Sequence, residues 1–256
     1  MPYTSQERDN LRAQLVAAAR TDPRIIGAAL TGSAATGLED RWSDIDLLFG
    51  LRNASDLPSA LADWTTRMYG EHGAVHHVDV PFGAAVYRVF LLQSSLQVDL
   101  AFAPAAEFGA RAPSFRLLFG VASELPHVSP PAAESLIGLA WLYAVHARSC
   151  IARGKLWQGE YMVSGVRDHV LSLACLRHGL PAAQGRGTDR LPAEVTTPLL
   201  AALVKRLDAD ELRRALRIGV EALLAETVHI DEGLARRLQK VLTELASPTR
   251  KAQEQT

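Results

Sequence analysis

The sequence is short of cysteine and of net charge, and each shortage argues against a class of protein. Only two cysteines occur among 256 residues, Cys150 and Cys175. Neither lies in a motif with ligand spacing, so a disulfide framework or a zinc site has no support. A net charge of −1 and a pI near 6.7 give no overall basic field. This balance disfavours extended nucleic-acid binding.

Long apolar segments are also missing. Residues 1–10, MPYTSQERDN, lack the apolar core of a signal peptide, and we find no apolar run of the length needed to span a bilayer. The richest run, residues 136–145, is followed by His146 and Arg148 and is typical of a buried helix. We therefore expect a cytoplasmic, reduced protein without membrane contact. The sequence does not indicate its oligomeric state.

Alternating and helical patterns divide the chain into two parts. A length of 256 residues suffices for two modest domains. Residues 104–131 contain several prolines and are expected to be irregular, and we place the domain boundary in them. We predict one domain over residues 1–128 and a second over residues 129–256. The polar residues 247–256 are expected to fray.

The predicted fold class is α+β, with a mixed five-stranded sheet and flanking helices followed by a helical bundle. In the first domain the patterns favour helices at residues 4–20 and 55–69 and strands at residues 25–30, 45–50, 75–80, 86–93 and 96–102. A possible capping box, Thr4-x-x-Glu7, opens the first helix. In the second domain we predict helices at residues 132–153, 160–178, 196–207, 211–226 and 232–246.

Residues 26–50, IGAALTGSAATGLEDRWSDIDLLFG, contain the most informative pattern. Side chains alternate along a strand, so Asp44 and Asp46 project to one face while Ile45, Leu47 and Phe49 project to the other. Two neighbouring carboxylates repel each other unless a cation lies between them. An all-oxygen pair suits Mg²⁺, or Mn²⁺, better than zinc.

Gly32 and Ser33 precede these acids at the end of a buried strand. Glycine lets the backbone approach a ligand closely, and the free N–H groups of a following helix favour an anion. We predict that this corner binds phosphate. A phosphate site followed by paired metal-binding carboxylates indicates a metal-bridged polyphosphate substrate.

The pattern of Gly-Ser, a ten-residue spacer and Asp-x-Asp resembles the signature of the DNA polymerase β-type nucleotidyltransferase superfamily. The resemblance implies transfer of a nucleoside monophosphate from a nucleoside triphosphate to a hydroxyl group, with two Mg²⁺ ions. It implies that Asp44 and Asp46 contact both ions and that Ser33 binds the β- or γ-phosphate. A sheet domain followed by a helical domain is similar to the small aminoglycoside and lincosamide nucleotidyltransferases. The matching motif covers about a third of the chain.

The resemblance also implies a third carboxylate on a later strand, for which the chain offers two candidates. Asp99 lies in the alternating stretch SLQVDLAFA, in which Val98 and Leu100 would face the core. We favour Asp99 because a hairpin that turns at residues 94–95 would place its strand beside that of Asp44. Asp79, on another predicted strand, remains the alternative.

The second domain is expected to complete the site. Lys155, in a loop, is the preferred candidate for binding the triphosphate, with Arg153 and Arg167 as alternatives. Glu160, expected at a helix start, is the candidate general base. Further candidates of lower weight are Trp157, Tyr161, Asp168 and His169, the two aromatic residues as stacking partners of the nucleobase.

The predicted function is a metal-dependent nucleotidyltransferase that moves AMP, or another nucleoside monophosphate, from ATP to a hydroxyl group of an antibiotic-like small molecule. Two alternatives remain open. One is nucleotidylation of a protein or an RNA end, as in toxin–antitoxin systems, and the other is a non-catalytic nucleotide-binding module. The intact set of Gly32, Ser33, Asp44, Asp46 and Asp99 argues against the latter.

Overall fold

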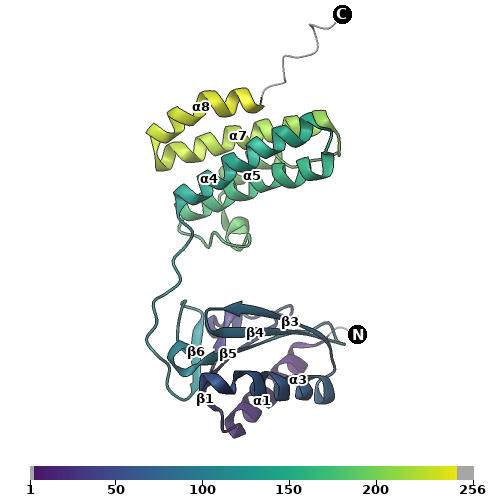
Figure 1. Ribbon diagram of the computed structural model, residues 1–256, viewed down its shortest axis with the longest axis vertical. Coiled ribbons are helices and arrows are strands. Elements are labelled where there is room, and N and C mark those ends of the chain that lie inside the picture. The colour runs from purple at the N-terminus through teal and green to yellow at the C-terminus, as the bar shows by residue number, and fades with distance from the viewer. Residues whose placement is uncertain (1–2, 247–256) are drawn as a thin grey trace, which may run out of the picture. The chain divides into compact units, whose positions relative to one another are not determined.

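The computed structural model describes residues 3–246 and divides into two compact units, Met1–Val128 and Ser129–Thr256. Each unit has its own buried core. Figure 1 shows the chain as a ribbon coloured from the N-terminus to the C-terminus. The predicted fraying of residues 247–256 lies outside the described residues.

A six-stranded mixed sheet forms the centre of unit 1, in the order β3-β4-β5-β2-β1-β6. Strands β2 and β5 run parallel, and all other neighbours are antiparallel. The strands are β1 (Ile25–Thr31), β2 (Ile45–Leu51), β3 (Ala74–Phe82), β4 (Ala85–Leu92), β5 (Gln97–Pro104) and β6 (Phe115–Phe119). The sheet therefore joins segments from the whole length of the unit.

Helices α1 (Ser5–Thr21) and α3 (Leu57–Glu71) lie on the same side of this sheet (Figure 1). The capping box is confirmed at α1, because Thr4 Oγ1 accepts a hydrogen bond from Glu7 N and Glu7 Oε2 accepts one from Thr4 N. The main core lies between helices and sheet. It includes Leu15, Trp64, Leu47, Phe49 and Phe102. The short elements α2 (Gly32–Thr36), η1 (Ala54–Asp56) and η2 (Ala105–Glu107) connect the strands.

The predicted α+β class is confirmed, but the sheet has six strands rather than five. Strand β6 lies within residues 104–131, which the prolines had led us to expect to be irregular. Its residue Leu117 pairs with Ala29 of β1 at the sheet edge. An edge strand forms hydrogen bonds on one side only and can be short, so β6, with five residues, leaves little periodicity in the sequence.

Unit 2 consists of helices packed around a main apolar core and a smaller apolar cluster. They are α4 (Ala133–Ala152), α5 (Leu156–Arg177), α6 (Ala193–Leu200), α7 (Ala209–Ile230) and α8 (Glu232–Ala246), with a short turn η3 (Thr188–Arg190). Several predicted boundaries were wrong, among them the end of α7, which was expected at residue 226 and lies at Ile230. Helix α5 begins at Leu156 instead of residue 160, and α6 ends at Leu200 instead of residue 207.

Helix α4 is the one helix among the described residues that is long and apolar enough to cross a membrane by length and composition. This differs from the expectation that no segment reaches that length. The helix packs against α5, α7 and α8. Ile137, Ala140, Ala144 and Ala147 are buried in the core of the bundle, so the apolar character of α4 is explained by its packing.

Candidate active site

Parallel pairing of β2 with β5 places three acidic residues at one end of the sheet. Asp46 of β2 lies directly opposite Asp99 of β5, and Asp44 immediately precedes β2. The alternate residues Ile45, Leu47 and Val98 are buried against the helices. Because side chains alternate along a strand, burial of this apolar face directs the three carboxylates to the other face.

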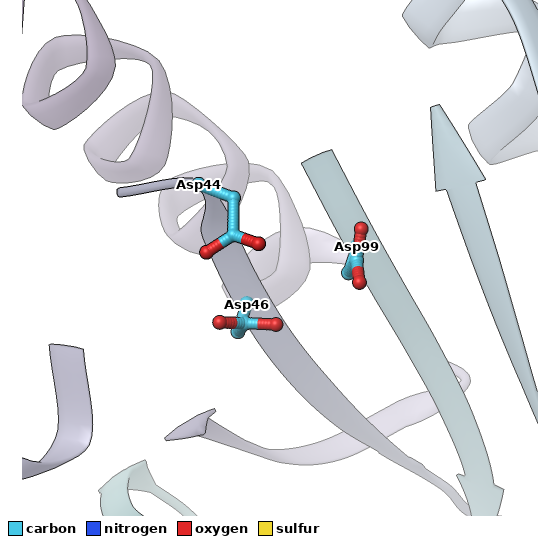
Figure 2. A group of neighbouring side chains, drawn as sticks. All are labelled: Asp44, Asp46 and Asp99. Carbon is cyan, nitrogen blue, oxygen red and sulfur yellow. The ribbon is translucent and has the colours of Figure 1, made fainter. Parts of the chain in front are cut away.

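The carboxylates of Asp44, Asp46 and Asp99 converge (Figure 2). One oxygen from each residue can be chosen so that all three lie within 4.8 Å of one another, and all three side chains are half-buried. A set of donors made only of carboxylate oxygens fits a hard divalent cation such as Mg²⁺ or Mn²⁺. The structure therefore has a cluster that can hold a metal ion.

The environment of Asp99 shows the cost of bringing these charges together. Burial raises the pKa of Asp99, and the negative charge of Asp44 raises it further. The hydrogen bond from Gln97 opposes this rise in pKa. Gln97 Nε2 donates to Asp99 Oδ1 at 2.9 Å and approaches Asp44 Oδ2 at 3.5 Å. A bound cation would neutralise the repulsion that this single amide group only partly offsets.

Gly32 and Ser33 lie beside the carboxylates at the end of β1. Gly32 has φ +60°, a left-handed conformation that favours glycine, and a Cβ at this position would overlap Asp46 Oδ2. Ser33 is half-buried in the first turn of α2. The structure thus brings together Gly32, Ser33, Asp44, Asp46 and Asp99, which are all the predicted site residues of unit 1.

Asp79, the alternative third acid, lies away from this cluster. It is on β3, and its carboxylate accepts two hydrogen bonds from Arg88, each 2.7 Å long. Arg88 also bonds to α3 through Thr65 Oγ1, so the pair lies on the helical side of the sheet. The carboxylate triad therefore contains Asp99 and not Asp79.

The predicted residues of unit 2 lie around the start of α5. Lys155 is exposed in the residue before this helix, and Gly154 has φ +67°. Glu160 is the fifth residue of α5 rather than at its start, because the helix begins earlier than expected. Its Oε1 accepts a hydrogen bond of 2.6 Å from Ser164. Among the lower-weight candidates, Arg167 forms an ion pair with Asp168, whereas Trp157 and Tyr161 are exposed.

Two residues near the triad were not identified as functional from the sequence. Gln97 could have been found, because it shares the alternating face of Asp99 and lies two residues before it. No sequence pattern links Tyr87 to the triad. Its place is set by pairing with Ala101 of β5. Burial raises the pKa of Tyr87, and the charge of Asp46 adds to this effect while that of Arg111 opposes it.

Comparisons with known proteins found one matching family model and similar solved structures. Residues 12–108 match the family model described as a nucleotidyltransferase domain. The chain also resembles the crystal structure of an aminoglycoside 6-adenyltransferase from Bacillus subtilis, with 12% identity over 96% of this chain and 100% of that chain and a TM-score of 0.42. A likeness at that identity and TM-score carries no functional argument. No curated protein matches the chain.

The matched residues all lie in unit 1, so this unit contains the part of the chain that is similar to a nucleotidyltransferase domain. The match includes the Gly32–Ser33 corner and all three carboxylates, Asp44, Asp46 and Asp99.

Proposed function

We propose that this protein transfers a nucleoside monophosphate, AMP from ATP, to a hydroxyl group of an antibiotic-like small molecule. The observation that carries the proposal is the convergence of three carboxylates within a nucleotidyltransferase domain. In this proposal unit 1, residues 1–128, is the catalytic domain, and unit 2, residues 129–256, binds nucleotide and substrate. We further propose a cytoplasmic location and a role in antibiotic resistance.

Each site residue of unit 1 has a proposed role that follows from its position. Asp44, Asp46 and Asp99 would hold two Mg²⁺ ions, which when bound supply charge neutralisation for the leaving pyrophosphate and acidify the acceptor hydroxyl. Gly32 leaves room for the Asp46 carboxylate beside the backbone. Ser33 would donate a hydrogen bond to the β- or γ-phosphate. Gln97 orients Asp99 and Asp44. Positioning and charge neutralisation make up most of the catalysis of phosphoryl transfer.

Unit 2 would contribute one group for nucleotide binding and one for proton removal. Lys155, exposed at the α4–α5 connection, is the proposed ligand of the triphosphate, because its ammonium group is a compact charge on a flexible stem. Glu160 is the proposed general base and would accept the proton of the acceptor hydroxyl. Its carboxylate is held by the Ser164 hydroxyl.

The proposal is tested by measuring pyrophosphate release from ATP and MgCl₂ across a panel of aminoglycosides, lincosamides and other hydroxylated antibiotics. We expect release with at least one acceptor and its loss, by about 10³-fold or more, in Asp46→Asn. Asp79→Asn is the matched control, because it removes a carboxylate of the same sheet outside the triad. Normal turnover in Asp46→Asn would refute the metal mechanism.

The same assay separates the alternatives. Isothermal titration shows whether ATP binds with Mg²⁺. Binding without turnover on any small molecule, protein extract or RNA would indicate a non-catalytic nucleotide-binding module. Transfer of labelled AMP to protein or to an RNA end, and not to the antibiotic panel, would indicate the other alternative.

A further inference from the structure

Strand β3 forms an edge of the sheet that its sequence does little to protect. Within residues 3–246, β3 pairs with β4 on one side and with no strand on the other. It has nine residues, whereas the opposite edge strand β6 has five. A free edge exposes unpaired backbone N–H and C=O groups, and natural proteins usually keep such strands short or place lysine on them. Strand β3 contains no lysine, and its one carboxylate, Asp79, is paired with Arg88.

Apolar side chains are exposed along the same edge. Val78 pairs with Val89, which pairs with Asp99, so Val78 lies on the face of the sheet that carries the triad. Val78 and Val80 are 54% and 49% exposed, and Leu91 of the neighbouring strand β4 is 49% exposed. None of the three belongs to an apolar cluster of unit 1. Their burial against another surface would be favourable, at roughly 25 cal/mol per Å² of apolar area.

Pro81 indicates which backbone groups of β3 point to the free edge. Proline has no N–H, so within a sheet it is tolerated where that group would point away from the paired strand. The backbone groups of successive residues alternate in direction along an antiparallel strand. His77 and Asp79 therefore direct their N–H and C=O groups to the free edge. Val78 and Val80 direct theirs to β4.

A second copy of the chain can pair with this edge in an antiparallel register centred on Val78. Two-fold symmetry then sets Val78 opposite Val78 of the second copy, and His77 opposite Asp79 of the second copy. His77 lies on the helical face, where the Tyr69 hydroxyl of α3 is 3.0 Å from His77 Nδ1. When that hydroxyl donates to Nδ1, His77 Nε2 keeps its hydrogen and can donate to the facing carboxylate. The edge is therefore complementary to itself in this register.

Neighbouring registers are less favourable. Pairing centred on Asp79 would set two carboxylates opposite each other, and like charges directly opposite destabilise a sheet. Pairing centred on His77 would set Asp79 opposite Val75. That residue lies where the register of β3 is interrupted, between Ala74 and His76. The register centred on Val78 avoids both faults.

We propose that β3 is the interface of a homodimer, in which it pairs antiparallel with β3 of a second copy around Val78. The two sheets then form one continuous sheet, with the two-fold axis perpendicular to it. Both triads lie on the same face of the joined sheet, and no triad residue takes part in the contact, because β4 separates β3 from β5. The dimer requires neither nucleotide nor metal, so its test is independent of the proposed function.

Sedimentation velocity of the full chain tests for the dimer. We expect a species of twice 27.7 kDa to predominate at roughly 100 µM. Val78→Lys replaces an apolar contact by two facing ammonium groups and should weaken dimerisation about tenfold or more. Leu117→Lys is the matched control and should leave the dimer unchanged, because Leu117 is 41% exposed on β6, the opposite edge of the sheet. A wild-type chain that stays monomeric, or equal weakening by both variants, would overturn the inference.

Cross-linking tests the register. Val78 and its copy would form a non-hydrogen-bonded pair with Cα atoms about 4.5 Å apart, a spacing that suits a disulfide. Val80 lies on the same face, but the two Val80 residues would be roughly 13 Å apart along the strands. Val78→Cys should therefore form a disulfide-linked dimer about tenfold faster or more than Val80→Cys under mild oxidation, as measured on non-reducing gels. The native Cys150 and Cys175 are buried.

The two cysteine variants also distinguish this interface from other modes of association. Cross-linking of Val78→Cys alone would support pairing of β3 in the proposed register. Equal cross-linking of both variants would indicate non-specific association. A dimer in which neither variant cross-links would use another surface. Either of these last two results would overturn the inference.

Discussion

At Gly32 the backbone comes so close to Asp46 that only a hydrogen atom fits. Two glycines at the ends of α2 have left-handed φ angles, Gly32 at +60° and Gly37 at +71°. A Cβ at Gly32 would overlap Asp46 Oδ2, whereas a Cβ at Gly37 would meet nothing within 4 Å. A residue with a Cβ would therefore meet the same backbone strain at either position, but only at Gly32 would it displace the Asp46 carboxylate.

We predict that Gly32→Ala weakens Mn²⁺ binding about 10- to 100-fold, because the Asp46 carboxylate has to move. Gly37→Ala should cost about 1–2 kcal/mol of stability and leave Mn²⁺ affinity unchanged. Electron paramagnetic resonance titration measures the affinity, and thermal unfolding measures the strain common to both variants. Equal metal affinity in the two variants would show that Gly32 has no role beyond its backbone angle.

The raised pKa of Asp99 predicts an unusual pH dependence for the metal-free protein. The folded state binds the Asp99 proton more tightly than the unfolded chain does, so this group contributes stability below its unfolded pKa, near 4. That contribution is lost as pH rises through the folded pKa. In buffer containing EDTA at pH 7, Asp99→Asn should therefore raise the melting temperature.

Added Mg²⁺ should reverse this order. It binds the ionised triad of the wild type and stabilises the folded state by mass action. Asp99→Asn should lose most of that gain. Melting curves from pH 4 to 8, with EDTA and with MgCl₂, measure both effects. If Asp99→Asn melts below the wild type in EDTA at pH 7, burial of the Asp99 charge is not a net cost.

At the scale of elements, the alternation of side chains along the strands decides which acid joins the triad. Asp79 and Asp99 both lie on strands of the same sheet. Asp99 and Tyr87 lie on the same face of the sheet. Asp79 pairs with Arg88, and both lie on the opposite face, which the helices cover. A shift of one residue in the register of β3 would exchange the faces.

We predict that Asp79→Asn leaves Mn²⁺ affinity and pyrophosphate release unchanged. It should reduce stability by less than about 1 kcal/mol, because the Asp79 side chain is 42% exposed and solvent weakens its ion pair. Arg88 keeps its hydrogen bonds to Thr65 Oγ1 and to the backbone of Leu61. Denaturant unfolding and the metal titration measure both quantities. Reduced metal affinity in Asp79→Asn, at unchanged stability, would return Asp79 to the list of candidate ligands.

Sequence patterns predicted residues that are close in the chain better than contacts between segments that are far apart in it. Gly32, Ser33, Asp44 and Asp46 are close in the chain, and their motif order alone indicated a site that binds phosphate and metal. Strand β6 was missed because its pairing with β1 joins segments some ninety residues apart and leaves no local pattern. Tyr87 was missed for the same reason, since its place near the triad depends on pairing with Ala101 of β5.

At the scale of the whole molecule, each unit has a core of its own. Leu15, Phe49, Trp64 and Phe102 belong to the core of unit 1, and the largest core of unit 2 is built from other residues, among them Ile137 and Leu223. The triad and the Gly32–Ser33 corner both lie in unit 1. Metal binding should therefore need unit 1 alone.

We predict that a fragment of residues 1–128 folds cooperatively, because unit 1 has its own core. It should bind Mn²⁺ within about threefold of the full chain, a difference of less than about 1 kcal/mol, because the whole triad lies in unit 1. It should release no pyrophosphate, because the groups proposed for nucleotide binding and proton removal, Lys155 and Glu160, lie in unit 2. Circular dichroism, metal titration and the pyrophosphate assay measure these properties. A full chain that carries Lys155→Gln should keep its metal affinity and raise the KM for ATP. A folded fragment that turns over as fast as the full chain would place the entire catalytic apparatus in unit 1 and remove Lys155 and Glu160 from it.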